Sequence, residues 1–319
     1  MEDGLLSLSA VIATFNEADN IAACIESVAG VDEVVVNDDG STDGTVEIAE
    51  SLGAKVFRRS EHAEFATQDD VDAFAQRFGW APRFEAGSRI RNGHLEAREG
   101  IDHASHDWVV CPDADERVSW DLPRIRREIL PNADQIISEF VHSHKADGSP
   151  ERVSTITKMF RKSVTRLEGR THGVVIPFGR IVSIPFMRVD HWQKPGHSQG
   201  YVLPIMEYCV MKDDDARSRF YLGREYYYYG ERAKALTLLD LYLSEATWMP
   251  EIAQARLYAA RCYWESGQGD EARKSCLEAV LINPDHKEAL ALMAELYFEP
   301  WRSKWQRIAD AATDKDILF

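Results

Sequence analysis

The spacing of apolar residues changes near residue 213, and this change constrains the fold more than any other feature of the sequence. Before it, short apolar runs alternate with segments of helical spacing, an order that predicts a parallel sheet with right-handed crossovers. From Ala216 onward the spacing is helical and the pattern repeats itself. We therefore expect two domains, residues 1–212 and residues 213–319, each long enough to bury a core.

The first half has the element order of a parallel α/β sheet. Its strand-like runs are short, rich in β-branched residues and bounded by polar turns. We expect strands at residues 8–15, 32–37 and 55–58, a helix that begins after an N-cap at Asp19, and a helix over residues 45–52. Farther along we expect helices at residues 68–78 and 95–104, a strand at residues 107–111, and mixed strands within residues 134–192.

Polar and acidic clusters follow three of the expected strands. These clusters are Thr14-Phe15-Asn16-Glu17, Asp38-Asp39-Gly40-Ser41-Thr42-Asp43 and Asp113-Ala114-Asp115-Glu116. Ligands bind at the carboxyl ends of the strands in an open parallel sheet, so the three clusters are expected to meet at one edge. Two carboxylates separated by one residue suit a hard cation, Mg²⁺ or Mn²⁺, which shares its oxygen ligands with substrate phosphates.

The helical half repeats its own landmarks. Gly230 recurs as Gly267, and Tyr226 recurs as Tyr263 at the same interval. This spacing resembles that of tetratricopeptide repeats, which are helical hairpins that bury their apolar faces against neighbouring repeats. Such arrays present concave surfaces suited to peptides. The repeats therefore predict a macromolecular partner, an interface for a homodimer, or both.

Composition and charge indicate which binding partners and which cell compartment to expect. The formal net charge is −16, which disfavours nucleic acid as a partner. The five cysteines are scattered and show no metal-binding spacing, as is typical of a reducing compartment. No apolar run approaches the length of a transmembrane helix, and the first residues do not have the pattern of a secretory signal. We expect a cytoplasmic protein with no transmembrane segment.

The order of the motifs in the first half resembles that of family 2 glycosyltransferases with the GT-A fold. The segments that carry the resemblance are VIATFNE, VVVNDDGSTDGT, Ile90-Arg91-Asn92 and WVVCPDADE, within residues 8–120. The repeats that follow are similar to those of a subgroup that includes bacteriocin S-glycosyltransferases. The resemblance implies a Rossmann-like GT-A domain for nucleotide-diphospho-sugars, followed by an all-α domain of the tetratricopeptide type.

The resemblance also assigns binding roles. Thr14, Asn16 and Glu17 would line the nucleotide pocket, and Asp38 or Asp39 would accept a hydrogen bond from the base, commonly uracil. The groups that would approach the nucleotide, ribose or donor sugar are Arg91, Asn92, Asp113 and Ala114. Asp115 would hold Mn²⁺ or Mg²⁺, with His191 or His172 completing the metal shell. The implied donor is a UDP-sugar.

Family 2 enzymes invert the anomeric carbon, and inversion needs one base to deprotonate the acceptor. Asp190, Glu168 and Glu116 are the candidate carboxylates, and His172 is a possible substitute; we favour Asp190 because it follows a strand-like run beside His191. The sequence departs from the family pattern in having Gly173 after His172, where a glutamate is usual. It also lacks the usual Glu-Asp pair, and residues 60–88 form a longer segment than usual.

A protein or peptide is the acceptor that the repeats favour. A lipid-linked or polysaccharide acceptor and modified DNA remain alternatives, as does a non-catalytic scaffold with a degenerate first domain. A nucleotidyltransferase is disfavoured, because the loop after the first strand is acidic rather than rich in glycine and basic residues.

Overall fold

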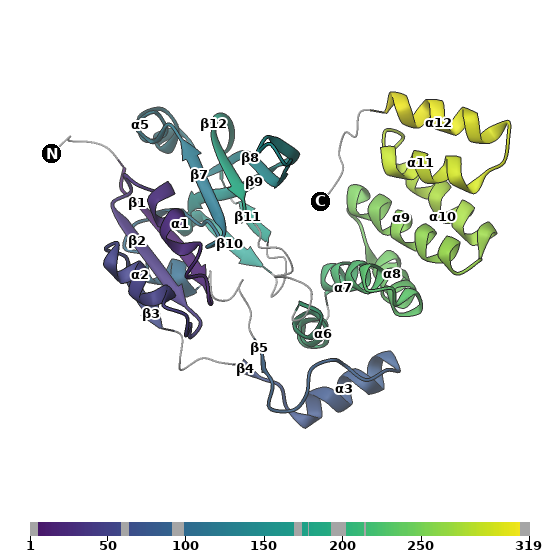
Figure 1. The fold of residues 1–319 in the computed structure, drawn as a ribbon, viewed down its shortest axis with the longest axis horizontal. Helices are drawn as coiled ribbons and strands as arrows, with labels where there is room; N and C mark the ends of the chain where they lie inside the picture. Colours follow the sequence, from purple (N-terminus) through teal and green to yellow (C-terminus); the bar gives the residue numbers. More distant parts are fainter. Residues whose placement is uncertain are drawn as a thin grey trace. The chain divides into compact units, whose positions relative to one another are not determined.

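The computed structural model describes seven stretches of the chain, and the statements below concern these stretches: residues 6–58, 64–90, 99–168, 174–177, 179–192, 202–213 and 215–312. Internal contacts divide the chain into two units. The first comprises residues 1–66 and 87–200, and the second comprises residues 67–86 and 201–319. Figure 1 labels most of the helices and strands of both units.

An eight-stranded sheet forms the centre of the first unit. Its order is β3-β2-β1-β6-β9-β8-β12-β7. The bounds of these strands are β1 Leu8–Thr14, β2 Glu33–Asp38, β3 Lys55–Arg58, β6 Trp108–Val110, β7 Glu116–Trp120, β8 Gln135–His144, β9 Pro150–Arg161 and β12 Ile181–His191. Two further pairs, β4 Glu64–Phe65 with β5 Arg89–Ile90 and β10 Thr165–Glu168 with β11 Val174–Pro177, form small antiparallel sheets.

Strand direction brings most carboxyl ends to one edge of the sheet. β1 is parallel to β2 and β6, and β2 is parallel to β3. β9 is antiparallel to both β6 and β8, so β8 runs in the same direction as β6; β12 is parallel to β8. β1, β2, β6, β8 and β12 therefore all point toward the edge where ligands bind in open α/β sheets.

Helices cover both faces of the parallel part of the sheet. α1 (Ile21–Ser27) and α2 (Thr45–Ser51) pack against one face, where Ile12 and Val36 are buried. Val11 and Val35, the preceding residues, pack on the other face against the helical turn at residues 99–103. Burial on both faces explains why these strands read as continuous apolar runs.

The N-cap expected for the first helix is wrong by one residue. α1 is preceded by Asn20 rather than Asp19, and no side chain caps it. The backbone supplies the start instead, because the carbonyl of Glu17 accepts hydrogen bonds from the N–H groups of Asn20 and Ile21.

A short chain of irregular helical turns follows β7, made of α5 Leu122–Arg124, η1 Ile125–Ile129 and η2 Leu130–Asn132; η3 Lys162–Val164 follows β9.

The second unit is entirely helical in the part that the structure describes. Its helices are α3 Gln68–Phe78, α6 Val202–Asp213, α7 Ala216–Tyr228, α8 Arg232–Glu245, α9 Met249–Glu265, α10 Gly269–Ile282, α11 Lys287–Leu296 and α12 Trp301–Ala311. α3 has the bounds expected from the sequence and begins with a capping box between Thr67 and Asp70.

This division differs from the expected boundary at residues 212 and 213. α6 and the segment with α3 belong with the repeats, since Lys212 of α6 donates to Asp70 of α3 at 2.7 Å and Tyr208 packs edge-on against Phe84. α6 could not be recognised from the sequence because it is apolar on most sides, with Leu203, Tyr208 and Val210 all buried. A helix buried on most of its sides lacks the amphipathic spacing used to recognise helices.

The recurrence of tyrosine and glycine in the repeats corresponds to one kind of helix ending. After α7, Gly230 has φ +81°, and the N–H of Glu231 donates to the carbonyl of Tyr226 at 2.8 Å. After α9, Gly267 has φ +77°, and the N–H of Gln268 donates to the carbonyl of Tyr263 at 2.8 Å. Both are Schellman endings, which need a residue in the left-handed conformation that glycine adopts most easily.

Among the helices that the structure describes, none combines the length and the apolar character that a membrane span requires.

Candidate active site

The loops that follow β1 and β2 are tied to each other. Asn16 has φ +52°, and its side-chain oxygen accepts from the N–H of Thr42 at 2.9 Å. The N–H of Asn16 donates to the hydroxyl of Ser41 at 2.8 Å, and that of Glu17 donates to the hydroxyl of Thr45 at 2.8 Å. Asn16 and Glu17, both expected in the nucleotide pocket, therefore also hold this double loop in shape.

The two aspartates after β2 have different surroundings. One oxygen of Asp38 accepts from the N–H groups of Gly40 and Ser41, each at 2.9 Å, so this carboxylate closes its own turn. Asp39 is buried, with 1% of its side chain exposed, and forms an ion pair with Arg89. Of the two, Asp39 is the carboxylate that pairs with a guanidinium from outside the turn.

Thr14 contributes a buried hydroxyl beside these loops. Its carbonyl accepts from the N–H of Asp39 at 3.0 Å, which ties the ends of β1 and β2 together. Its side-chain hydroxyl is buried and has no hydrogen-bond partner among the residues that the structure describes. A buried polar atom of this kind usually has a partner, so the hydroxyl is suited to a ligand at this edge.

The acidic segment after β6 surrounds a lysine that sequence reasoning missed. The ammonium of Lys158, on β9, lies 2.8 Å from a carboxylate oxygen of Asp113 and 2.9 Å from one of Glu116. Burial opposes the charge of Lys158, but the two carboxylates outweigh burial and raise its pKa. Burial raises the pKa of Glu116 to about 8, against the effect of Lys158 and with the help of the Asp113 charge. β9 carries several other polar residues, so Lys158 does not stand out in the sequence, and its partners are distant in sequence.

Asp115 and His191 form the closest pair of expected metal ligands. Nε2 of His191 lies 3.1 Å from Oδ2 of Asp115, and both side chains are partly exposed. The hydrogen bond to Asp115 raises the pKa of His191, and burial opposes the rise only in part. The N–H of Trp192 also donates to the carbonyl of Asp115 at 2.8 Å. The end of β12 is thus fastened to the acidic segment by both side chain and backbone.

The donor set of this pair fits a divalent cation shared with a substrate. No group of three His, Cys, Asp or Glu side chains suited to a metal occurs within the described ranges. Mg²⁺ and similar cations, however, commonly use one or two protein ligands and take the rest from water and substrate phosphates. Asp115 supplies a carboxylate and His191 an imidazole, which is a common metal ligand. The pair therefore suits a metal–diphosphate complex better than a closed metal cage.

The other expected site residues lie elsewhere or outside the description. Asp190 does not join Asp115, because consecutive side chains of a strand point to opposite faces and His191 occupies the face toward Asp115. Ala114 packs in the core with Ile12 and Cys24, so its methyl group is not available to a ligand. Glu168 ends β10, and its side chain is outside the description, as are Arg91, Asn92 and His172.

Comparison with known proteins shows which families two segments of the chain resemble. Residues 9–68 match the family model described as Glycosyl transferase family 2, and residues 229–296 match a Tetratricopeptide repeat model. The lipopolysaccharide core biosynthesis glycosyltransferase LpsC of Rhizobium meliloti (strain 1021) is 26% identical over 231 residues, which are 68% of this chain and 76% of that protein. The chain is a glycosyltransferase. The glycosyltransferase carries a family 2 segment in its sheet unit and tetratricopeptide repeats in its helical unit.

Two further comparisons cover smaller parts of the glycosyltransferase. An uncharacterized glycosyltransferase of Rickettsia felis is 62% identical over 51 residues, which are 16% of this chain and 18% of that protein. A structure of glucosyl-3-phosphoglycerate synthase from Mycobacterium tuberculosis, in complex with Mn²⁺, UDP and glucosyl-3-phosphoglycerate, has 23% identity and a TM-score of 0.28. That match covers 42% of this chain and 44% of that one, so the glycosyltransferase spans less than half of it.

The expected fold class is confirmed. The first unit is a mixed α/β sheet of the GT-A type with its family 2 motifs at the carboxyl edge, and the helical unit contains the expected repeats. The particular subgroup of bacteriocin S-glycosyltransferases stays a prediction.

Proposed function

We propose that this enzyme transfers a sugar from a nucleotide-diphosphate donor, a UDP-sugar, to a macromolecular acceptor with inversion at the anomeric carbon. The observation that carries the proposal is the contact between Asp115 and His191 at the carboxyl edge of the sheet. Asp115 belongs to a motif with one residue between two aspartates, and the loops of β1 and β2 end at the same edge. Metal ligands and nucleotide-binding loops on one edge match the needs of a nucleotide-sugar transferase.

Residues of the two loops provide the proposed nucleotide site. The buried hydroxyl of Thr14 can donate a hydrogen bond to a base or ribose, or accept one from it. The buried carboxylate of Asp39 can accept one. Asp113 is mostly exposed and is held by Lys158, and it keeps its proposed role toward the ribose or sugar. Arg91 and Asn92 keep their proposed role toward the donor.

Asp115 and His191 would hold Mn²⁺ or Mg²⁺, which when bound neutralises the diphosphate leaving group. The protein's own contribution is to fix both ligands before the donor arrives. Trp192 fastens the backbone of Asp115, and the imidazole of His191 fixes one of its carboxylate oxygens. A ligand whose orientation is already set loses less entropy on binding.

The donor and the metal are tested together. The purified protein is incubated with UDP-, GDP- and TDP-sugars in the presence of Mn²⁺, and release of the nucleoside diphosphate is measured. We expect slow hydrolysis of a UDP-sugar that is abolished by a chelator and reduced at least about 100-fold in Asp115→Ala. Asp121→Ala, a change at the helix cap of α5, serves as the control. Absence of both hydrolysis and calorimetric binding for every donor would favour the scaffold function instead.

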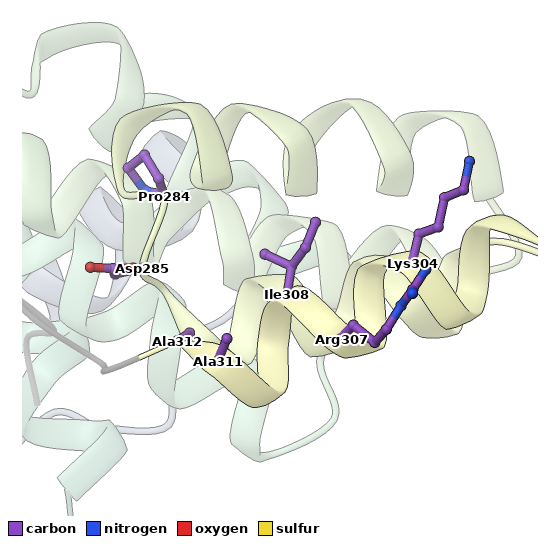
Figure 2. A pocket seen from close by; sticks show the side chains of 7 residues that line it. All are labelled: Pro284, Asp285, Lys304, Arg307, Ile308, Ala311 and Ala312. Atoms are coloured by element: carbon purple, nitrogen blue, oxygen red, sulfur yellow. The ribbon is translucent and has the colours of Figure 1, made fainter.

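The acceptor that we favour is a protein or peptide, because the helical unit offers it a surface. A groove of about 560 Å³ lies between the turn at Pro284 and Asp285 and one side of α12. Figure 2 shows the side chains that line it. Lys304 and Arg307 line it beside the apolar side chain of Ile308. Cations next to an apolar surface suit a segment that carries both acidic and apolar residues.

A saccharide acceptor is the second candidate, and the likeness to LpsC favours it, since that relative is named for lipopolysaccharide core biosynthesis. The two candidates are separated by offering labelled UDP-sugar with either a peptide mixture or core oligosaccharide. Transfer to peptide, weakened by Arg307→Glu through a higher KM, would support the first. Transfer to oligosaccharide that is indifferent to Arg307→Glu would support the second.

A further inference from the structure

His144 and Asp190 form a second pair of a histidine and a carboxylate. Asp190 directly precedes His191, the partner of Asp115, in the sequence. Nε2 of His144, the last residue of β8, lies 2.9 Å from Oδ1 of Asp190 on β12. The other oxygen, Oδ2, accepts a hydrogen bond from Nε of Arg188 at 2.8 Å. Both side chains of the pair are buried, with 9% of His144 and 7% of Asp190 exposed. Asp190 is therefore a fixed carboxylate with one oxygen dedicated to the imidazole.

An aromatic side chain joins this pair to the acidic segment. The indole of Trp192 stacks on the imidazole of His144, with ring centroids 4.1 Å apart and planes inclined by 9°. The backbone N–H of the same Trp192 donates to the carbonyl of Asp115 at 2.8 Å. Trp192 is 47% exposed, so it bounds His144 on one face and meets solvent elsewhere. A single residue, Trp192, therefore contacts both His144 and the backbone of Asp115, the proposed metal ligand.

The hydrogen bond to Asp190 determines which ring nitrogen accepts a proton. An ionised carboxylate only accepts hydrogen bonds, so Nε2 carries the hydrogen and Nδ1 carries the lone pair. Within the part of the chain that the structure describes, Asp190 is the group that hydrogen-bonds to the ring of His144. An imidazole whose second nitrogen is oriented by a buried carboxylate is the arrangement of a general base.

Strand geometry places the two pairs on opposite sides. Asp190 and His191 are consecutive in β12, and consecutive side chains point to opposite faces. His191 turns toward Asp115, on the side proposed for the diphosphate, and Asp190 turns toward His144. His144 is the last residue of β8 and His191 is the last residue of β12, so both pairs lie at the carboxyl ends of these two strands.

We propose that His144 is the base that deprotonates the acceptor and that Asp190 is its positioning residue. In the step, the acceptor O–H proton moves to Nδ1 of His144 as the acceptor oxygen bonds to the anomeric carbon. The bond from that carbon to the diphosphate oxygen breaks, and its electron pair leaves with the nucleoside diphosphate. The inference rests on the proposed function. It also changes the role of Asp190 from the base to the group that orients the base.

The test uses two nucleophiles that differ in their need for a base. Water must lose a proton when it attacks the donor, whereas azide is already an anion. The full chain is given Mn²⁺ and the UDP-sugar selected by the donor panel, and release of UDP is followed in buffer alone and with sodium azide. We expect His144→Gln and Asp190→Asn to lower hydrolysis by about 10²- to 10³-fold and to leave glycosyl azide formation within about twofold of the unmodified protein.

Three controls distinguish a base from a structural residue. His106→Gln makes the same change at the opposite edge of the sheet, where His106 contacts Ser9, and is expected to keep full hydrolysis. The affinity of each variant for the UDP-sugar, measured by calorimetry, should be unchanged. The double variant should be no slower than either single variant, because the two residues act as one unit.

The outcomes separate the inference from the proposed function. Hydrolysis by His144→Gln at the unmodified rate, or an equal loss of the water and azide reactions, would overturn the assignment of the base alone. An unmodified protein that neither binds nor hydrolyses any nucleotide sugar would overturn the proposed function, and the base with it. If Asp190→Asn does not fold, as judged by circular dichroism, His144→Gln still decides between these outcomes.

Discussion

At the residue scale, Lys158 is a cation placed between two carboxylates. It contacts Asp113 at 2.8 Å and Glu116 at 2.9 Å, and only 12% of its side chain is exposed. We predict that Lys158→Met lowers the free energy of unfolding by about 1–3 kcal/mol, because it leaves the buried carboxyl of Glu116 without this hydrogen-bonding partner. Urea denaturation followed by circular dichroism measures this loss.

Removing the second partner should restore most of this stability. Glu116 is the more buried carboxylate, with 3% of its side chain exposed against 61% for Asp113. We therefore expect the double variant Lys158→Met with Glu116→Gln to recover more than half of the lost stability, whereas Lys158→Met with Asp113→Asn recovers less. Equal recovery by both would mean that the charge balance, rather than burial, governs this cluster.

The same residues mark the limit of what the sequence predicts. Asp115 and His191 were expected to meet, because a motif after one strand and a histidine after another come to the same edge. Lys158 and His144 were not found, since each depends on partners more than forty positions away, and nothing near them in the sequence signals the contact. Asp190 was assigned by its neighbours in sequence, but strand alternation turns its side chain away from them.

At the scale of elements, the repeats depend on glycines that end helices. Gly267 follows α9 with φ +77°, and a Cβ atom there would meet nothing within 4 Å. The cost of Gly267→Ala is therefore conformational alone, and we predict a loss of about 1 kcal/mol in the free energy of unfolding. Chemical denaturation of the full chain provides the measurement.

A neighbouring glycine gives the matched control. Gly269 is the first residue of α10, does not have a positive φ, and its added Cβ would make ordinary contacts with Arg273. Gly269→Ala should leave stability unchanged or raise it by about 0.5 kcal/mol, because alanine has the higher helix propensity. Equal destabilisation by both substitutions would contradict the assignment of Gly267 to a Schellman ending.

Elements were predictable where a local signal marks them. α3 has both a capping box and amphipathic spacing, and its expected bounds agree with the structure. α1 begins without a side-chain cap, so the residue assigned to its start was wrong. α6 is buried on most sides and was missed, because its burial depends on neighbours from other parts of the chain.

At the scale of the whole molecule, neither unit is one continuous stretch of chain. Residues 67–86 lie in the sequence between two parts of the sheet unit but belong to the helical unit. Within the helical unit, the indole N–H of Trp80 donates to the hydroxyl of Tyr226 at 3.1 Å, and that hydroxyl donates to Glu207 at 2.6 Å. Burial raises the pKa of Glu207, with the hydrogen bond from Tyr226 acting against it. The segment thus completes a polar network inside the repeats rather than forming a surface loop.

We predict that Trp80→Ala destabilises the helical unit by roughly 2–4 kcal/mol, since it removes both a large aromatic side chain and the donor to a buried hydroxyl. Trp264→Ala, at a tryptophan that is 42% exposed, should change stability by no more than about 0.5 kcal/mol. Native-state hydrogen exchange of the full chain resolves the two units. Faster exchange in α6 and α7, but not in β1 and β2, is the expected result for Trp80→Ala. Unchanged exchange in α6 and α7 would mean that residues 67–86 do not stabilise the repeats, and the first repeat would then have to bury Tyr226 by itself.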